Sequence, residues 1–140
     1  MFNLRAHESG FDCVMSAEVD NVDLAASEVR RFLEGRGNVT GLFGIEIALR
    51  EALLNAVMHG SYGNPAMSVA LRLRVDEKAL RLVVQDQGQG FSWRDETMQP
   101  PPPDESKGRG LAIMARYFDR VRFNDTGNCV EMLHVLQARD

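Results

Sequence analysis

Residues 44–60 read GIEIALREALLNAVMHG, and this stretch decides the fold. Apolar side chains recur in it at the spacing of an α-helix and form one continuous stripe, made of Ile45, Ala48, Leu49, Ala52, Leu53, Ala56 and Val57. The loop at residues 59–65 follows with two glycines and a proline, which end a helix. The pattern therefore predicts a helix over residues 44–58 that buries one side against a core.

Polar residues line one edge of this predicted helix. Glu51, Asn55 and His59 follow one another at intervals of four residues, so on an α-helix they stack along the border of the apolar stripe. A carboxylate, an amide and an imidazole in line at a buried margin can hold a hydrated metal ion and activate a hydroxyl group. The alternative is a helix whose polar residues share an edge by chance.

Further helices are expected on both sides of this stretch. Apolar residues recur at helical spacing over residues 22–33, and charged residues lie off that stripe. Asn21 is placed to cap the start of this helix, and Gly35 and Gly37 mark its end. The first residues of the chain alternate weakly between apolar and polar, which indicates a strand. A short helix is expected at residues 110–118.

Two pairs of alternating runs predict β-hairpins. One pair covers residues 69–75 and 80–84, and the other covers residues 121–123 and 130–136. In the first pair, apolar and polar residues alternate, so one face is buried and one is wet. Because the strands cluster together with helices before and between them, the sequence predicts an α+β fold with a mostly antiparallel sheet and helices on one face.

Length and composition limit the class of protein. The chain has 140 residues, enough for one domain over residues 1–140, with 44% hydrophobic and 26% charged residues. The net charge of −4 disfavours nucleic acid as the main partner. No apolar run approaches the roughly 20 residues of a membrane helix, and the start does not read as a secretory signal. Two isolated cysteines fit free thiols in a reducing cytoplasm.

Two glycine-containing segments follow the predicted helix. Asp86, Gly88 and Gly90 come directly after an apolar strand, where a carboxylate can accept a hydrogen bond from an exocyclic amine and glycines let the backbone approach a flat ligand. The segment 107–110 (Lys107, Gly108, Arg109 and Gly110) opens a helix, whose free amides and added positive charge suit phosphate. Taken singly, the two segments could equally be a glycine turn and a plain helix entry. Between them, residues 92–107 form a long loop with four prolines.

The three segments together resemble a known superfamily of ATPases, the one that includes gyrase, heat-shock chaperones, histidine kinases and mismatch-repair ATPases (GHKL). Glu51-xxx-Asn55 is similar to its N box, Asp86-x-Gly88-x-Gly90 to its G1 box, and Gly108-x-Gly110 to its G2 box. The form NAxxHG at residues 55–60 and GRGLAIM at residues 108–114 look most like the bacterial anti-sigma-factor serine kinases. The resemblance implies a two-layer α/β sandwich, the histidine-kinase-like ATPase fold.

The resemblance also implies roles for the matching residues. Asn55 would bind the Mg²⁺ that bridges the phosphates of ATP, and Glu51 would be the general base. Asp86 would bind the adenine amino group, and the glycines at 88 and 90 would give the ring room. Residues 93–107 would form the ATP lid, and the glycines at 108 and 110 its phosphate-facing hinge. His59 would lie near the phosphates, although a lone histidine is more often structural.

The implied activity is that of an ATP-dependent protein serine kinase in a partner-switching system. It would phosphorylate an anti-anti-sigma-type partner and sequester a sigma factor or another regulatory target, with Arg30 and Arg31 as candidate contacts; family members commonly form homodimers. Two alternatives stay open. Met58 and the four consecutive prolines at 100–103 also suit a nucleotide-gated binding regulator without kinase activity. A stand-alone histidine-kinase-type catalytic domain would need a partner with a phosphorylatable histidine.

Overall fold

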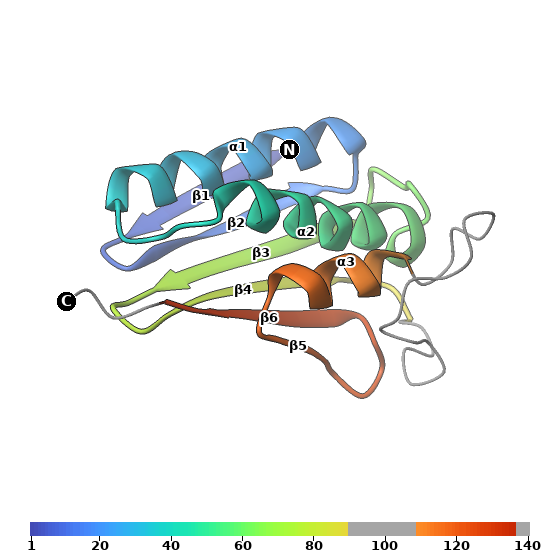
Figure 1. Cartoon of the computed structure of the whole chain (residues 1–140). Coiled ribbons are helices and arrows are strands. Elements are labelled where there is room, and N and C mark those ends of the chain that lie inside the picture. The colour runs from blue at the N-terminus through green and yellow to red at the C-terminus, as the bar shows by residue number, and fades with distance from the viewer. Residues whose placement is uncertain (90–108, 137–140) are drawn as a thin grey trace.

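A computed structural model describes residues 1–89 and 109–136, with the backbone alone for Arg109. These residues form two layers, an antiparallel sheet and a layer of helices that covers one of its faces (Figure 1). The order of strands across the sheet is β1-β2-β3-β4-β6-β5. The predicted α+β fold, with helices on one face of a mostly antiparallel sheet, is confirmed.

Every neighbouring pair of strands in the described sheet is antiparallel. The strands are β1 (Phe2–His7), β2 (Gly10–Ser16), β3 (Ser68–Val75), β4 (Ala79–Asp86), β5 (Arg120–Phe123) and β6 (Cys129–Val135). Both predicted hairpins are present. The first residues form two strands rather than one, and β1 is an edge strand whose residues are mostly exposed. Such a strand has no buried face, so apolar and polar residues do not alternate clearly along it.

The helices are α1 (Val19–Arg36), α2 (Leu42–Asn55), the π-helix η1 (Ala56–Gly60) and α3 (Arg109–Tyr117). Helix α1 ends as predicted, because Gly37 adopts a left-handed conformation (φ 76°) and its N–H donates to the Leu33 carbonyl. The prediction that Asn21 caps this helix is wrong. Helix α1 begins earlier, after Glu18, and Asn21 is buried inside it. The Asn21 amide instead donates to the carbonyl and the hydroxyl of Ser16, at 2.9 and 3.0 Å.

Helix α2 lies at the centre of the helical layer. The apolar stripe predicted from its sequence is buried, and Leu49 and Leu53 have no exposed surface. They join the core with the inward residues of the strands, such as Leu73 and Leu82. On another side of the helix, a Cβ atom at Gly44 would lie 2.2 Å from the Tyr117 ring. The missing side chain therefore lets α3 pack closely against α2.

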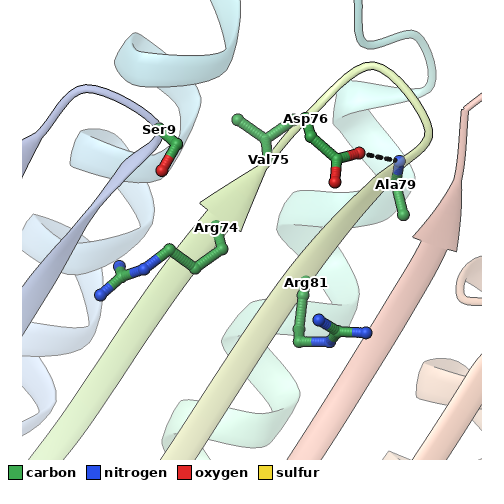
Figure 2. Close-up of a pocket in the computed structure, with 6 residues that line it drawn as sticks. All are labelled: Ser9, Arg74, Val75, Asp76, Ala79 and Arg81. Carbon is green, nitrogen blue, oxygen red and sulfur yellow. Dashed lines mark hydrogen bonds between the residues drawn. The ribbon is translucent and has the colours of Figure 1, made fainter.

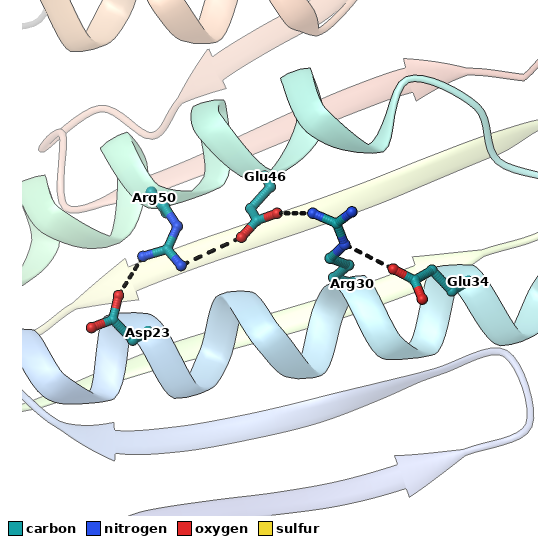
Figure 3. Close-up of polar contacts among 5 residues, drawn as sticks. All are labelled: Asp23, Arg30, Glu34, Glu46 and Arg50. Atoms are coloured by element: carbon teal, nitrogen blue, oxygen red, sulfur yellow. Dashed lines mark hydrogen bonds and ion pairs between the residues drawn. The ribbon is translucent and has the colours of Figure 1, made fainter.

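A chain of charges ties α1 to α2 on the outer surface (Figure 3). Arg50 pairs with Asp23 and lies 3.4 Å from Glu46, and Arg30 bridges from Glu46 at 2.9 Å to Glu34 at 2.7 Å. We call these five residues the charge ladder. Each pair is partly solvent-exposed, so its energy is small, and two of the four pairs, Arg50–Asp23 and Arg30–Glu46, link one helix to the other.

Candidate functional site

The start of α3 packs against the polar edge of α2. A Cβ atom built on Gly110 would lie 2.8 Å from the Asn55 side-chain nitrogen and 3.4 Å from Glu51 Oε2. Glu51 and Asn55 are both half-buried. The fold thus brings together three residues that the sequence predicts for the site, and only a glycine leaves space between the helix start and the two polar side chains.

A second cluster forms where η1 meets the end of β4. A Cβ atom on Gly60 would lie 2.2 Å from Asp86 Oδ2, and one on Gly88 would lie 2.0 Å from the Gly60 carbonyl oxygen. Two segments far apart in the sequence therefore contact each other through glycines on both sides. The sequence predicts the site roles of Asp86 and Gly88. It gives Gly60 only as part of a motif, without its packing against the carboxylate.

Asp86 sits in this cluster with a defined set of hydrogen bonds. The Gly88 N–H donates to Asp86 Oδ1 at 2.7 Å, and the Asp86 N–H donates to the Asn128 carbonyl at 2.9 Å. The Asn128 side chain donates to the Gly88 carbonyl at 3.2 Å. Burial raises the pKa of the Asp86 carboxyl, and the bond from Gly88 opposes that shift. Asn128 is a supporting residue that sequence reasoning missed, because an asparagine in a hairpin turn is common.

The π-helix η1 connects the two clusters. The prediction of an α-helix as far as residue 58 is wrong beyond Asn55, where the hydrogen bonds change to the wider π pattern. Glu51, Asn55 and His59 therefore do not follow one α-helical edge, and His59 is exposed. The widened turn carries the chain from the polar pair on α2 to the contact between Gly60 and Asp86. Such π segments occur often at functional sites.

Ser61 follows directly after η1 and has no exposed surface. Its hydroxyl has no hydrogen-bond partner among the described residues. A buried hydroxyl in this state ordinarily binds a water molecule or a ligand group. The residue was not predicted, since a serine in a glycine-containing loop carries no distinctive signal.

Several predicted residues fall outside the described part of the chain. These are Gly90, Lys107, Gly108 and the lid at residues 93–107, which includes the prolines. Arg109 begins α3, and its side chain is not described.

A hollow lies at the opposite end of the sheet from Asp86 (Figure 2). Its lining comes from β3, β4, the turn between them and the turn between β1 and β2, and consists of Ser9, Arg74, Val75, Asp76, Ala79 and Arg81. None of the predicted site residues lines it. The hollow is therefore separate from the candidate site.

The candidate site offers two kinds of chemistry side by side. A half-buried carboxylate and amide face the N-terminal turn of α3, where free backbone N–H groups favour an anion. A partly desolvated carboxylate is packed between glycines at the end of β4, where it can accept a hydrogen bond from a polar ligand group. In the part of the chain that the structure describes, no three His, Cys, Asp or Glu side chains are grouped to hold a metal ion.

The sequence matches the family model of the histidine kinase-like ATPase domain over residues 15–133. The chain therefore belongs to the histidine kinase-like ATPase family. The matched region contains the polar pair on α2, Asp86 and the start of α3. A solved structure of the mycobacterial sensor histidine kinase MprB supports the fold, with a TM-score of 0.53 and 19% identity over 90% of this chain and 98% of that one.

Two relatives are proteins named anti-sigma F factor. The one from Bacillus cytotoxicus is 35% identical over 81 residues, which is 55% of this chain and 56% of the relative. The one from Halalkalibacterium halodurans is 33% identical over 82 residues, 56% of each chain. The match thus spans about half the length of each relative. Among the described helices, none combines the length and apolar character needed to cross a membrane.

Proposed function

We propose that this chain binds ATP with Mg²⁺ at the candidate site and acts as an anti-sigma-factor-type protein serine kinase of a partner-switching system. The observation that carries the proposal is the convergence of three distant segments. Gly110 lies against Glu51 and Asn55, and Gly60 and Gly88 lie against Asp86. Five of the residues implied by the family resemblance, Glu51, Asn55, Asp86, Gly88 and Gly110, thus lie in two clusters joined by one π turn.

The chemistry of these residues fits a magnesium nucleotide. An amide oxygen is a suitable ligand for a hard cation that keeps phosphate oxygens and water as its other ligands, and Asn55 can supply one. The first turn of α3 supplies backbone donors for phosphate. Asp86 supplies a carboxylate acceptor for an exocyclic amine. Ser61, next to Gly60 in the chain, adds a buried hydroxyl that has no hydrogen-bond partner among the described residues.

Each residue then has a distinct task in phosphoryl transfer. Bound Mg²⁺ would neutralise negative charge on the phosphates. Glu51 accepts the proton of the incoming seryl hydroxyl at a carboxylate oxygen. Asn55 would hold the metal ion through its amide oxygen. Asp86 with Gly88 and Gly90 orients the adenine. Lys107, Gly108, Arg109 and Gly110 would contact the phosphates, and the exposed His59 is a further candidate for such a contact.

The names of the two relatives support the assignment to partner switching. On this view the substrate is an anti-anti-sigma-type protein, the sequestered target is a sigma factor or a comparable regulator, and the location is the cytoplasm. Helix α1 offers Arg31, whose side chain is 78% exposed and 3.5 Å from Glu28. Arg30 is engaged in the charge ladder, so a partner would have to compete with Glu34 and Glu46 for it.

Calorimetry and phosphotransfer together test the proposal. Wild type should bind ATP in magnesium buffer and label a co-purified partner with acid-stable phosphate, as expected for serine. Glu51→Ala should still bind ATP and lose transfer by about 10²–10⁴-fold, the usual contribution of a general base. Glu77→Ala, an exposed turn residue, is the matched control and should behave like wild type.

Other results would point elsewhere. Tight ATP binding without any transfer to a partner would favour the nucleotide-gated regulator, for which the half-exposed Met58 beside His59 is the relevant observation. Acid-labile phosphate on the product would identify histidine as the acceptor. Absence of ATP binding by wild type would refute the proposal as a whole.

A further inference from the structure

The face of the sheet opposite the helices carries a concentration of arginines. The registers place their side chains on that face in two rows across the strands. One row runs Arg5, Asp12, Arg72, Val83, Glu131 and Arg122, and the next runs His7, Gly10, Arg74, Arg81, Leu133 and Arg120. Figure 1 shows helices on one side of the sheet only, so among the described elements nothing covers these rows. We call this surface the arginine face.

The charge of the arginine face opposes that of the whole chain. Its two rows hold six arginines and two carboxylates, a surplus of four positive charges, whereas the chain has a net charge of −4. The remaining residues are therefore strongly acidic on balance. A basic surface on an acidic molecule is a specific feature of this face and does not follow from overall composition.

The two carboxylates do not neutralise the face. Asp12 is shared by Arg74 at 2.9 Å, Arg72 at 3.5 Å and His7 at 3.0 Å. The hydrogen bond to His7, followed by the bond to Arg74, lowers the pKa of its carboxyl, and burial opposes that shift. Glu131 lies 3.5 Å from Arg81.

The remaining arginines leave charge available at the edges. Arg5, Arg120 and Arg122 are exposed and form no ion pair with another described residue. Arg72, which does have a partner, is still 64% exposed. Guanidinium groups in this state can form bidentate bonds with incoming carboxylates.

Aliphatic side chains lie among these charges. Val83 and Leu133 occupy positions in the two rows, and Val14 lies in the adjoining row, 41% exposed. No Phe, Tyr or Trp occupies the two rows, so the face lacks the stacking platforms by which proteins hold unpaired bases. Arginine combined with exposed aliphatic surface is instead typical of protein interfaces.

We infer that the arginine face docks an acidic segment of a partner protein, one with several Asp or Glu side chains and a few apolar ones. Charge complementarity selects the carboxylates, and Val83 and Leu133 contact the apolar residues. A nucleic acid fits less well, because the two rows offer no aromatic side chain on which bases could stack, and Val83 and Leu133 would face charged phosphates instead of apolar groups. The hollow beside Arg74 and Arg81 ends the face at the β3–β4 turn (Figure 2).

Fluorescence anisotropy tests this inference without any nucleotide, so the result is independent of the proposed kinase activity. The probe is a labelled 20-residue peptide, about four-fifths glutamate with leucine at every fifth position. It should bind wild type at low salt and dissociate as salt screens the charges. Arg72→Gln with Arg122→Gln should weaken binding about tenfold, the sum expected for two or more exposed ion pairs.

The matched control is Arg36→Gln with Arg116→Gln, which removes the same charge from exposed positions on α1 and α3 and should leave binding unchanged. If the first pair fails to fold by circular dichroism, Arg5→Gln with Arg120→Gln replaces it at the edge strands. Three results would overturn the inference: no binding of the peptide, equal loss in the control, or tighter binding of a 20-nucleotide DNA than of the peptide. Self-association abolished by Arg72→Gln with Arg122→Gln would also overturn it, since a second copy would then occupy the face.

Discussion

Replacing Gly110 by alanine separates the stability of the fold from the function of the site. The added methyl group would lie 2.8 Å from the Asn55 side-chain nitrogen and 3.4 Å from Glu51 Oε2. Because 3.4 Å is ordinary contact, Glu51 can stay, while the Asn55 amide must withdraw by about 0.6 Å. The amide ends a side chain that can move, so the fold accommodates the change.

The two expected effects have opposite signs. Alanine is a better helix former than glycine by up to about 1 kcal/mol, and less at a helix end, so the free energy of unfolding should stay constant or rise. Phosphoryl transfer depends on groups held within a fraction of an ångström, and a displacement near 1 Å can cost about 100-fold. We therefore expect Gly110→Ala to reduce transfer by about 10- to 100-fold.

Urea unfolding and transfer of labelled phosphate to the partner measure these effects on the same samples. Gly35→Ala is the control, because it adds the same methyl group in α1 where nothing lies within 4 Å. Its free energy of unfolding should rise because alanine favours a helix more than glycine does, and it should transfer phosphate at the wild-type rate. Wild-type transfer by Gly110→Ala would refute the assignment of the α2–α3 contact to the site, and an equal loss in Gly35→Ala would show a nonspecific effect.

Three further substitutions test the other features. Asp86→Asn should abolish nucleotide binding and stabilise the ligand-free protein. Burial raises the pKa of the Asp86 carboxyl, so the wild type should lose stability relative to the variant as the pH rises through that pKa. Equal free energies of unfolding for the two proteins in urea titrations from pH about 4 to 8 would contradict this. Arg50→Gln should lower the free energy of unfolding by about 0.5 kcal/mol after allowance for solvent screening, and a difference that persists in 1 M salt would exclude an electrostatic cause. Leu53→Ala should cost about 2–5 kcal/mol in the same assay, whereas Leu24→Ala, at a half-exposed position, should stay within about 0.5 kcal/mol.

The spacing of apolar residues along the sequence predicts most of the fold. The stripe on α2 and the alternation in β3 and β4 each reflect a face that is buried, so they could be recognised from the sequence. The sequence predicts one strand where the β1–β2 hairpin lies, because β1 is at the edge of the sheet and exposes both of its faces. Asn21 suited a cap by residue type, but its amide satisfies the backbone of Ser16 in a buried position, and only the tertiary structure decides between these uses.

The sequence predicts those residues of the candidate site that can be recognised by their type and their spacing in the motifs. The association of Gly110 with Glu51 and Asn55 agrees with the motifs. The contact between Gly60 and Asp86 was not foreseen, because it depends on how the chain leaves α2. Five residues are too few for a change from α-helix to π-helix to alter the periodicity of apolar residues in the sequence. The burial of Ser61 follows from that change. These features arise from packing between segments that are distant in the sequence.

The five residues of η1 have a consequence for how this molecule tolerates change. A shorter chain there, with one residue deleted between Ala56 and Gly60, could continue as a regular helix with better hydrogen bonds. Such a deletion would rotate and retract the glycine that faces Asp86, so a gain in local regularity would separate the Gly60–Asp86 contact from the polar pair on α2. Regular hydrogen bonding in this turn and the contact between Gly60 and Asp86 therefore favour different lengths for the same segment.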